Sequence, residues 1–514
     1  MRHHPLSLAC ALALGPLLAS AQPGTLDPSF SGDGLFLSGL FTGNDFGRAV
    51  VVQPDGAVLL AGNAVVDGLS RFGVLRTLTN GELDTAFDDD GYTTIAFNEH
   101  NDACFAMARQ TDGGIVLAGY SNNGQQNDLA LARLTADGAL DPSFGGAGTV
   151  VVSYAPLSIE LCAVALQPDG RIVVAGNAFD GISGDLFVAR FNADGTPDTA
   201  FNGMGQVTTD VGDNAVGYGL AVLPDGRLLV AGYRETSAGP DLLLARYASD
   251  GSLDASFGTD GLVTTDLGQF WERIRAITID ADGSSVFVGT VGTSFAMMDV
   301  LVGRYLANGD PDLSFDVDGV LSIDVAGGAE EGTDILLQPD GRILVCGSVE
   351  VSGQARVLLA RLEQTGALDA TFGTDGLVLT DVASGDDYAA ALALAPDGKI
   401  VVGGTNSGGL GSDAFLARYF SGLPIGVEEQ GEGRHALQLW PVPAVDHLFI
   451  AHERIDPSAR LWVVAADGRV VMEQNLGARP LLRLDIADLA PGNYQVVVVG
   501  NGGRSEGRFT KVGR

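Results

Sequence analysis

The chain has 514 residues, of which 46% are hydrophobic and 18% charged, so its composition excludes a disordered protein and allows a large core. Residues 431–514 hold ten Lys or Arg and nine Asp or Glu, so the net charge of −35 lies almost entirely before them. Such an acidic surface repels phosphate backbones, and no nucleic-acid partner is expected.

The first 21 residues have the pattern of a secretory signal peptide. Basic Arg2 precedes an apolar run from Leu6 to Leu18, and Ala19-Ser20-Ala21 forms an A-x-A cleavage site. We therefore expect an exported mature chain that begins at Gln22. No later apolar stretch reaches the length of a membrane span, so no transmembrane segment is expected.

From residue 24 the chain repeats itself seven times, as the stretch "GALDPSFGG" (138–146) illustrates. The repeated Phe recurs every 56 to 58 residues, at Phe30, Phe87, Phe144, Phe201, Phe257, Phe315 and Phe372. An Asp three residues earlier, an Asp-Gly turn, a Gly seven residues after that Asp and an Arg keep the same period. Repeats of this length are typical of propellers, solenoids or arrays.

Each repeat contains four short strands. In the unit that starts at 366 they span 377–381, 389–395, 399–404 and 414–420, separated by Gly, Asp and Pro. No helical stripe intervenes, and the Asp-Gly pair predicts a tight hairpin between the second and third strands. Seven four-stranded units predict an all-β fold, a seven-bladed β-propeller over residues 22–422.

The second strand of each unit is expected to be the innermost strand of a blade. It carries a small residue such as Ala49 or Gly219 next to a large one, which suits sheets packed closely beside an axis. The last unit lacks an outer strand, so the N-terminal strand at about 35–39 is expected to pair with it and close the ring.

The repeated Asp, Phe and Arg are expected to have structural roles. The Asp should accept backbone N–H groups of its own turn, the Phe should pack between blades, and the Arg should pair with the Asp. Ligand clamping by the seven Arg–Asp pairs is the alternative, but identical placement in every blade favours structure.

The sequence segments "LDPSFGGAGTVV", "ALQPDGRIVVAGN" and "DLFVARFNADG" resemble the delta-60 repeat of secreted bacterial proteins. The resemblance covers residues 24–420 and implies a β-propeller. It implies no particular chemistry.

Candidate ligand-binding residues are those that break the repeat on the side of the variable loops. They lie between the first and second strands of two units: His100 in "FNEHND", and Phe270, Trp271, Arg273 and Arg275 in "GQFWERIRA". Solvated loops without a ligand are the alternative reading.

No catalytic residue, metal ligand or cofactor is predicted. Only His100 of the six His lies in the propeller, and the zinc and serine-hydrolase motifs are missing. The run Asp88-Asp89-Asp90-Gly91 lacks the order of a calcium loop, so we expect turns there, with calcium as the alternative.

Cys104 and Cys162 occupy similar places in consecutive units, and a disulfide between them is one possibility. It requires the small-residue face of each blade to look toward its successor; free thiols are the other possibility. Cys346, in "RILVCG", is expected to be a buried free thiol.

After a linker at 423–434 the period disappears. Apolar and polar residues alternate in the manner of strands over residues 435–514, which predicts a small C-terminal β-sandwich.

This segment resembles the type A C-terminal sorting domain of the type IX secretion system of Bacteroidota. The matching words are "LWPVPAVDHLFI", "AADGRVV", "LAPGNYQVVV" and "RFTKV", although Val442 stands where the family usually has Asn and Trp440 where it has Tyr. The motif positions are Trp440, Pro441, Pro443, Gly468, Gly492, Tyr494 and Lys511. The resemblance implies export by the type IX machinery, removal of the domain and often attachment to surface lipopolysaccharide; an ordinary sandwich is the alternative.

Together these patterns predict a secreted or surface-displayed binding or scaffold module whose extracellular ligand is a glycan or a protein. An extracellular propeller enzyme, such as a polysaccharide lyase or hydrolase, is the alternative.

Overall fold

The computed structural model divides between residues 425 and 426 into two units, both built from strands. It describes residues 22–423 except 40–42, 213, 409 and 410, and in the second unit 434–436, 438–440, 447–451, 460–465, 470–475, 481–487, 489–490, 492–500 and 503–511. The expected signal peptide and almost all of the expected linker lie outside these residues. No helix in the described part of the chain could cross a membrane.

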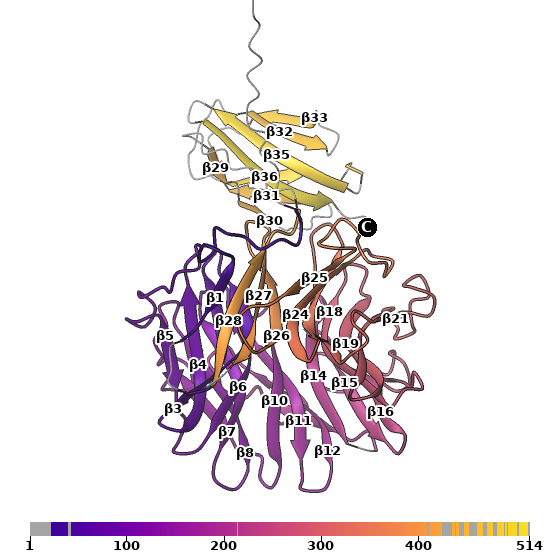
Figure 1. Cartoon of the computed structure of the whole chain (residues 1–514). Coiled ribbons are helices and arrows are strands. Elements are labelled where there is room, and N and C mark those ends of the chain that lie inside the picture. The colour runs from indigo at the N-terminus through magenta and orange to yellow at the C-terminus, as the bar shows by residue number, and fades with distance from the viewer. Residues whose placement is uncertain are drawn as a thin grey trace, which may run out of the picture. The chain divides into compact units, whose positions relative to one another are not determined.

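The first unit contains seven four-stranded antiparallel sheets, the blades (Figure 1). Blade 1 is β2 (Asp45–Val52), β3 (Val58–Val66), β4 (Leu69–Thr77) and β5 (Tyr92–Ile95). Blade 2 is β6 (Asp102–Arg109), β7 (Ile115–Asn122), β8 (Asn127–Leu134) and β9 (Thr149–Val152). Blade 3 is β10 (Ser158–Leu166), β11 (Ile172–Phe179), β12 (Gly184–Phe191) and β13 (Gln206–Thr209). Blade 4 is β14 (Ala215–Val222), β15 (Leu228–Thr236), β16 (Gly239–Tyr247) and β17 (Leu262–Thr265).

The remaining blades follow the same order. Blade 5 is β18 (Trp271–Ile279), β19 (Ser285–Ser294), β20 (Met297–Tyr305) and β21 (Val320–Ile323). Blade 6 is β22 (Glu330–Leu337), β23 (Ile343–Val351), β24 (Gln354–Leu362) and β25 (Leu377–Thr380). Blade 7 is β26 (Asp386–Leu394), β27 (Ile400–Gly408), β28 (Gly411–Tyr419) and, as its outer strand, β1 (Leu35–Leu37).

The first strand of each blade is innermost, as predicted. Strands β2, β6, β10, β14, β18, β22 and β26 contact one another in sequence, and β26 contacts β2, so they surround an axis. Strand β1 closes the ring by pairing with β28, where Leu35 lies opposite Ala417 and Leu37 opposite Phe415. The prediction of a seven-bladed, all-β propeller is confirmed.

The repeated Arg, Asp and Phe bind neighbouring blades together. In all seven copies the Asp accepts the backbone N–H two residues on, and its partner Arg lies within 2.5 to 3.2 Å. In blade 3, Arg190 also stacks on Phe201 and donates to the carbonyl of Ser249 in the following repeat. The structural interpretation of these pairs therefore suffices.

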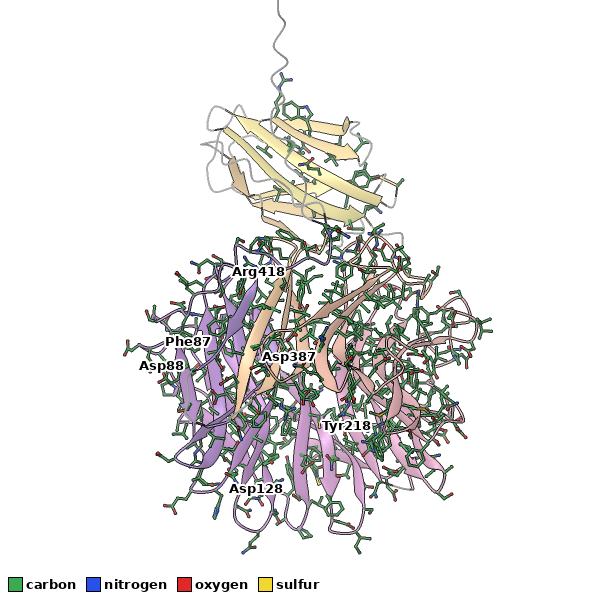
Figure 2. All side chains as sticks on the ribbon, in the orientation of Figure 1. Phe87, Asp88, Asp128, Tyr218, Asp387 and Arg418 are labelled. Atoms are coloured by element: carbon green, nitrogen blue, oxygen red, sulfur yellow. The ribbon has the colours of Figure 1, made fainter. Side chains whose placement is uncertain are left out.

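The loops between blades and the β3–β4-type hairpins share one end of the propeller, which we call the variable face. There the Ser70 hydroxyl donates to the carbonyl of Asp102, and the amide of Gly184 donates to Asn214. The Asp-Gly turns and the repeated motif occupy the opposite end; Figure 2 shows Arg418 near that end and Asp128 near the variable face.

Strands extend further toward the variable face than the sequence predicts. The strand expected at 389–395 is β26, Asp386–Leu394. The strand expected at 399–404 is β27, which continues to Gly408, and the strand expected at 414–420 is β28, which begins at Gly411. A β-bulge after Ala389 inserts one residue into β26, and the pairing then continues beyond it.

The possible disulfide between Cys104 and Cys162 is not formed, since both residues are free cysteines. Cys104 packs in the cluster between blades 1 and 2, and its backbone N–H donates to the side-chain oxygen of Asn63 in blade 1. Cys162 is the extra residue of a bulge in β10, which removes its side chain from the face that the sequence assigned to it. Cys346 is a buried free thiol, as expected.

The second unit contains a five-stranded sheet of order β29-β36-β35-β32-β33 and a three-stranded sheet of order β30-β31-β34. The strands are β29 (Arg434–Ala436), β30 (Gln438–Trp440), β31 (His447–Ala451), β32 (Arg460–Ala465), β33 (Val470–Asn475), β34 (Leu481–Asp485), β35 (Gly492–Gly500) and β36 (Gly503–Lys511). Leu448 and Leu484 of the smaller sheet share a hydrophobic cluster with Leu461 and Val496 of the larger one. Both sheets therefore contribute to one core.

Candidate ligand-binding site

Every innermost strand carries one β-bulge at the same place, seven residues before the Asp of the Asp-Gly turn. The bulged residues all differ: Arg48, Phe105, Cys162, Tyr218, Arg275, Thr333 and Ala390. Since none of them takes part in the strand ladder, this axial ring is where the repeat is free to vary.

Charged and aromatic side chains meet around the axis. A guanidinium nitrogen of Arg275 lies 2.5 Å from a carboxylate oxygen of Glu331, and the guanidinium carbon lies 4.6 Å from the ring centre of Tyr218. Burial lowers the pKa of Arg275, but the charge and hydrogen bond of Glu331 together with the neighbouring Tyr218 raise it by more, so the net shift is upward. The positive charge of Arg275 is thus held in place at the axis.

Arg48 comes from the other side of the ring, in blade 1. Its guanidinium lies 5.7 Å from the ring centre of Phe46 and 5.9 Å from that of Phe105, and no carboxylate of the described residues is within ion-pair distance. Burial and the nearby charge of Arg275 lower the pKa of Arg48, and the charge of Glu331 opposes them in part; the Arg48 side chain remains exposed to solvent. Arg48 and Arg275 therefore form an incompletely neutralised pair of positive charges.

Strand β18 carries a line of large polar and aromatic side chains. Trp271, Arg273 and Arg275 are partly exposed, whereas the intervening Glu272 and Ile274 are buried. The guanidinium of Arg273 lies 3.5 Å from the ring centre of Trp271 and 4.1 Å from that of Tyr233, and 3.4 Å from Glu235. Stacking between two aromatic rings fixes Arg273 more firmly than a single ion pair would.

Three aromatic side chains gather at the variable-face end of β18, and we call Phe270, Trp271 and Phe295 the aromatic platform. The ring centres of Trp271 and Phe295 lie 4.5 Å apart, and those of Phe270 and Phe295 lie 6.0 Å apart. Phe270 is 49% and Phe295 60% exposed, an unusual degree for clustered aromatic residues. The platform is therefore a preformed apolar surface in contact with solvent.

The structure brings together four of the five predicted ligand-binding residues. Phe270, Trp271, Arg273 and Arg275 form one continuous group, whereas His100 lies at the junction of blades 1 and 2. There the carbonyl of His100 accepts from Arg71, and its ring packs against Gly124. Among the described residues, no contact links His100 with blade 5.

Sequence reasoning missed Phe295, Tyr233, Arg48 and Tyr218. Phe295 lies in the β19–β20 hairpin, whose length the repeat does not fix, and Tyr233 replaces the small polar residue that blade 7 has at Thr405. Arg48 and Tyr218 stand out among the seven residues at the bulge position only once the structure has located the bulge.

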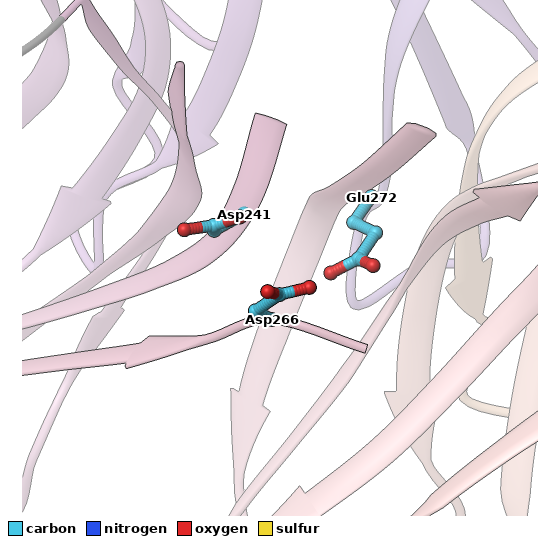
Figure 3. A group of neighbouring side chains, drawn as sticks. All are labelled: Asp241, Asp266 and Glu272. Atoms are coloured by element: carbon cyan, nitrogen blue, oxygen red, sulfur yellow. The ribbon is translucent and has the colours of Figure 1, made fainter. Parts of the chain in front are cut away.

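Two groups of carboxylates are the described residues best able to hold a metal ion. Asp241, Asp266 and Glu272 lie between blades 4 and 5, with oxygens within 4.8 Å of one another (Figure 3), and Asp299, Asp324 and Glu330 repeat the arrangement one blade on. Buried Glu272 accepts the amides of Leu267 and Gln269, at 2.8 and 2.7 Å. These two hydrogen bonds fix the loop between the blades, and burial raises the pKa of Glu272.

The acidic run at 88–91 forms a turn. Asp88 and Asp89 have positive φ angles, Asp88 accepts from Thr93, and Asp90 accepts the amide of Tyr92. These bonds account for the acidic side chains as turn residues.

The sorting motif is described in part. Tyr494 is buried and its hydroxyl donates to the carbonyl of Ala490, and Gly492 lies opposite Lys511 across the β35–β36 pair. Trp440 lies in β30, while Pro441, Pro443 and Gly468 fall outside the described residues.

Six segments of the chain match the family model described as "Domain of unknown function (DUF5122) beta-propeller". They are residues 53–87, 110–144, 167–201, 223–257, 338–372 and 395–422. The chain is a β-propeller repeat protein. The stretch 258–337 between matched segments of this propeller contains all of blade 5, so the family pattern is weakest where the aromatic platform lies.

No curated protein sequence matches the propeller chain. Among solved structures it is similar to Sqt1 from Chaetomium thermophilum, with 13% identity, 74% of this chain and 98% of that chain covered, and a TM-score of 0.40. It is also similar to a PL25 polysaccharide lyase, an ulvan lyase, with 10% identity, 75% and 96% coverage and a TM-score of 0.42. The polysaccharide lyase Uly1 is similar at 11% identity, with 78% of this chain and 98% of that chain covered and a TM-score of 0.41. Likenesses at this level carry no argument about function.

Proposed function

We propose that the protein is a secreted or surface-displayed binding module that holds an extracellular glycan or protein at the variable face of blade 5. The observation that carries this proposal is the grouping of Phe270, Trp271, Phe295 and Arg273 in the one blade region that departs most from the repeat. A ligand site needs polar and aromatic groups that only one part of a repetitive ring supplies. The seven Arg–Asp pairs, by contrast, are already used in holding the blades together.

The route of export is part of the proposal. The signal-peptide pattern at residues 1–21 supports passage across the inner membrane, and the sorting-domain resemblance of residues 435–514 supports transport by the type IX machinery. Attachment to surface lipopolysaccharide after removal of the domain would then display the propeller.

An extracellular propeller enzyme is the second candidate function. The observation that favours it is Tyr218 beside Arg275, because a phenol next to a guanidinium can take part in proton transfer at an acidic substrate. Burial raises the pKa of Tyr218, which makes its phenolate harder to form and weighs against a role as general base.

A screen of the mature protein on a combined glycan and peptide array tests the binding function. We expect a small set of related ligands, bound by the wild type and lost in Trp271→Ala. Ligand turnover in the same samples would support the enzyme instead. Ligands that bind Trp271→Ala as well as the wild type would contradict the assignment of the site.

A further inference from the structure

The aromatic platform and the axial arginines lie on one strand. Trp271 begins β18 and Arg275 is its bulged residue, four positions later, so at about 3.3 Å per residue they are separated by roughly 13 Å. Arg273 lies between them on the same side. The line leads from exposed rings at the variable face to the positive pair at the axis.

The two ends of this line have different chemistry. The rings of Phe270 and Phe295 offer flat apolar faces, against which the C–H faces of a sugar ring can stack. At the other end Arg48 makes no ion pair with a carboxylate of the described residues. It interacts with the charges of both Arg275 and Glu331, so these three groups carry one net positive charge. A carboxylate or sulfate between the two arginines would gain charge-assisted hydrogen bonds and relieve the repulsion.

We propose that this line binds an acidic glycan, with a sugar ring on the aromatic platform and its carboxylate or sulfate groups at Arg48 and Arg275. The inference rests on the proposed binding function and names its ligand class. The carboxylates along the line favour a glycan over an acidic peptide. Glu235 and Glu331 lie beside Arg273 and Arg275, and each can accept from a sugar hydroxyl.

The strong negative charge of the propeller restricts where an acidic glycan can bind. A polyanion is repelled by most of the surface, so it can bind only where arginines concentrate. The approach of the ligand should therefore depend on salt, and its position should be confined to the axis.

Calorimetric titration of the mature full chain tests the proposal. The probes are tetrasaccharides of alginate, pectate and chondroitin sulfate, with the methyl ester of the pectate tetramer as the uncharged match. We expect at least one acidic tetramer to bind, its ester or a neutral tetramer to bind at least about tenfold more weakly, and Arg48→Gln to weaken only the acidic ligand, by about tenfold. Arg356→Gln, which removes a charge from the outer part of blade 6, should leave binding unchanged.

Each other outcome decides between the two proposals. Equal binding of the acid and its ester would overturn acid recognition, and so would an unchanged affinity in Arg48→Gln with an unchanged melting temperature. If binding still depended on Trp271, the proposed binding site would stand. Trp271-dependent binding of a peptide and of no glycan would make the ligand a protein. If no probe or array ligand depends on Trp271, the proposed function fails as well.

Discussion

At the scale of single residues, the repeated Arg and Asp form buried ion pairs that stabilise the contacts between neighbouring blades. Arg190 and Asp198 are 6% and 8% exposed at their side chains, and Arg190 also stacks on Phe201 at 4.7 Å. Removing Arg190 would leave the buried carboxylate of Asp198 with only Arg171, at 3.1 Å and 39% exposed, as a cationic neighbour, which is costly in a low-dielectric setting.

Arg190→Ala should therefore lower the free energy of unfolding by about 3 kcal/mol, the lower end of the usual cost of breaking a buried pair, because Arg171 still faces Asp198. The matched control is Arg171→Ala, because Arg171 also contacts Asp198 but is 39% exposed, and its loss should cost below about 1 kcal/mol. Urea unfolding followed by circular dichroism measures both. Equal effects of the two substitutions would contradict the fastening role of the repeated Arg.

Asp334 replaces the small residue, Ala or Gly, that all six other blades have beside the axis. Its carboxylate accepts the amide of Leu392 in the next blade at 2.8 Å, and burial raises its pKa from 3.8 to about 6. The folded state thus keeps the proton to a higher pH than the unfolded chain does. Ionisation of Asp334 consequently opposes folding, with no effect below about pH 4 and the full effect above pH 6.

Asp334→Asn keeps an acceptor for the Leu392 amide and removes the ionisation. At pH 8 the variant should be more stable than the wild type by on the order of 2 kcal/mol, and at pH 4 the difference should vanish. Thermal melts of the two proteins at both pH values give the comparison. A constant difference across this range would show that Asp334 does not titrate as stated.

At the scale of elements, ring closure depends on the short strand β1. Asp27, which precedes it, is 2% exposed and accepts from Arg418 at 2.7 Å and from Lys399 at 3.1 Å. Both cations belong to blade 7, so this one carboxylate joins the two ends of the propeller.

Asp27→Ala should weaken the pairing of β1 with β28 and leave the other blades unchanged. We expect faster hydrogen exchange in β1 and β28 than in the wild type, with exchange in β11 and β12 of blade 3 unchanged, because those strands keep their own fastening pairs. Uniform acceleration in every blade, or none in β1, would argue against closure at this place.

The elements also show which parts of the site a sequence can predict. Trp271 and Arg273 could be found because they interrupt a pattern present in seven copies. The bulge could not be predicted, because the seven residues at its position share no residue type. It removes Cys162 from the strand ladder, and without it Arg48 and Tyr218 cannot be assigned to the axis. The sequence places His100 and Trp271 on the same face, because it gives the face of a loop but not the separation of two loops around the ring.

At the scale of the whole molecule, the propeller and the C-terminal segment differ in pattern and charge, and they form separate compact units. The propeller fold was predictable because seven copies fix its strands and its closure together. The second unit has one copy of each motif, so its proposed role in sorting rests on resemblance.

Deleting residues 435–514 should leave the propeller folded and keep it inside the outer membrane. Cell fractionation in a host with a type IX system measures its place, and proteolysis resistance measures its folding. As the control, residues 423–514 fused to a periplasmic reporter should carry the reporter to the surface or the medium. Export of the truncated protein would refute the sorting proposal.

The account as a whole depends on where the ligand lies. Hydrogen–deuterium exchange of the full chain, with and without the ligand selected by the array, tests this most directly. We predict protection at the start of β18 and at the β19–β20 hairpin, on the variable face of blade 5. Protection confined to the Asp-Gly turns at the opposite end, such as Asp169 to Arg171, would contradict it.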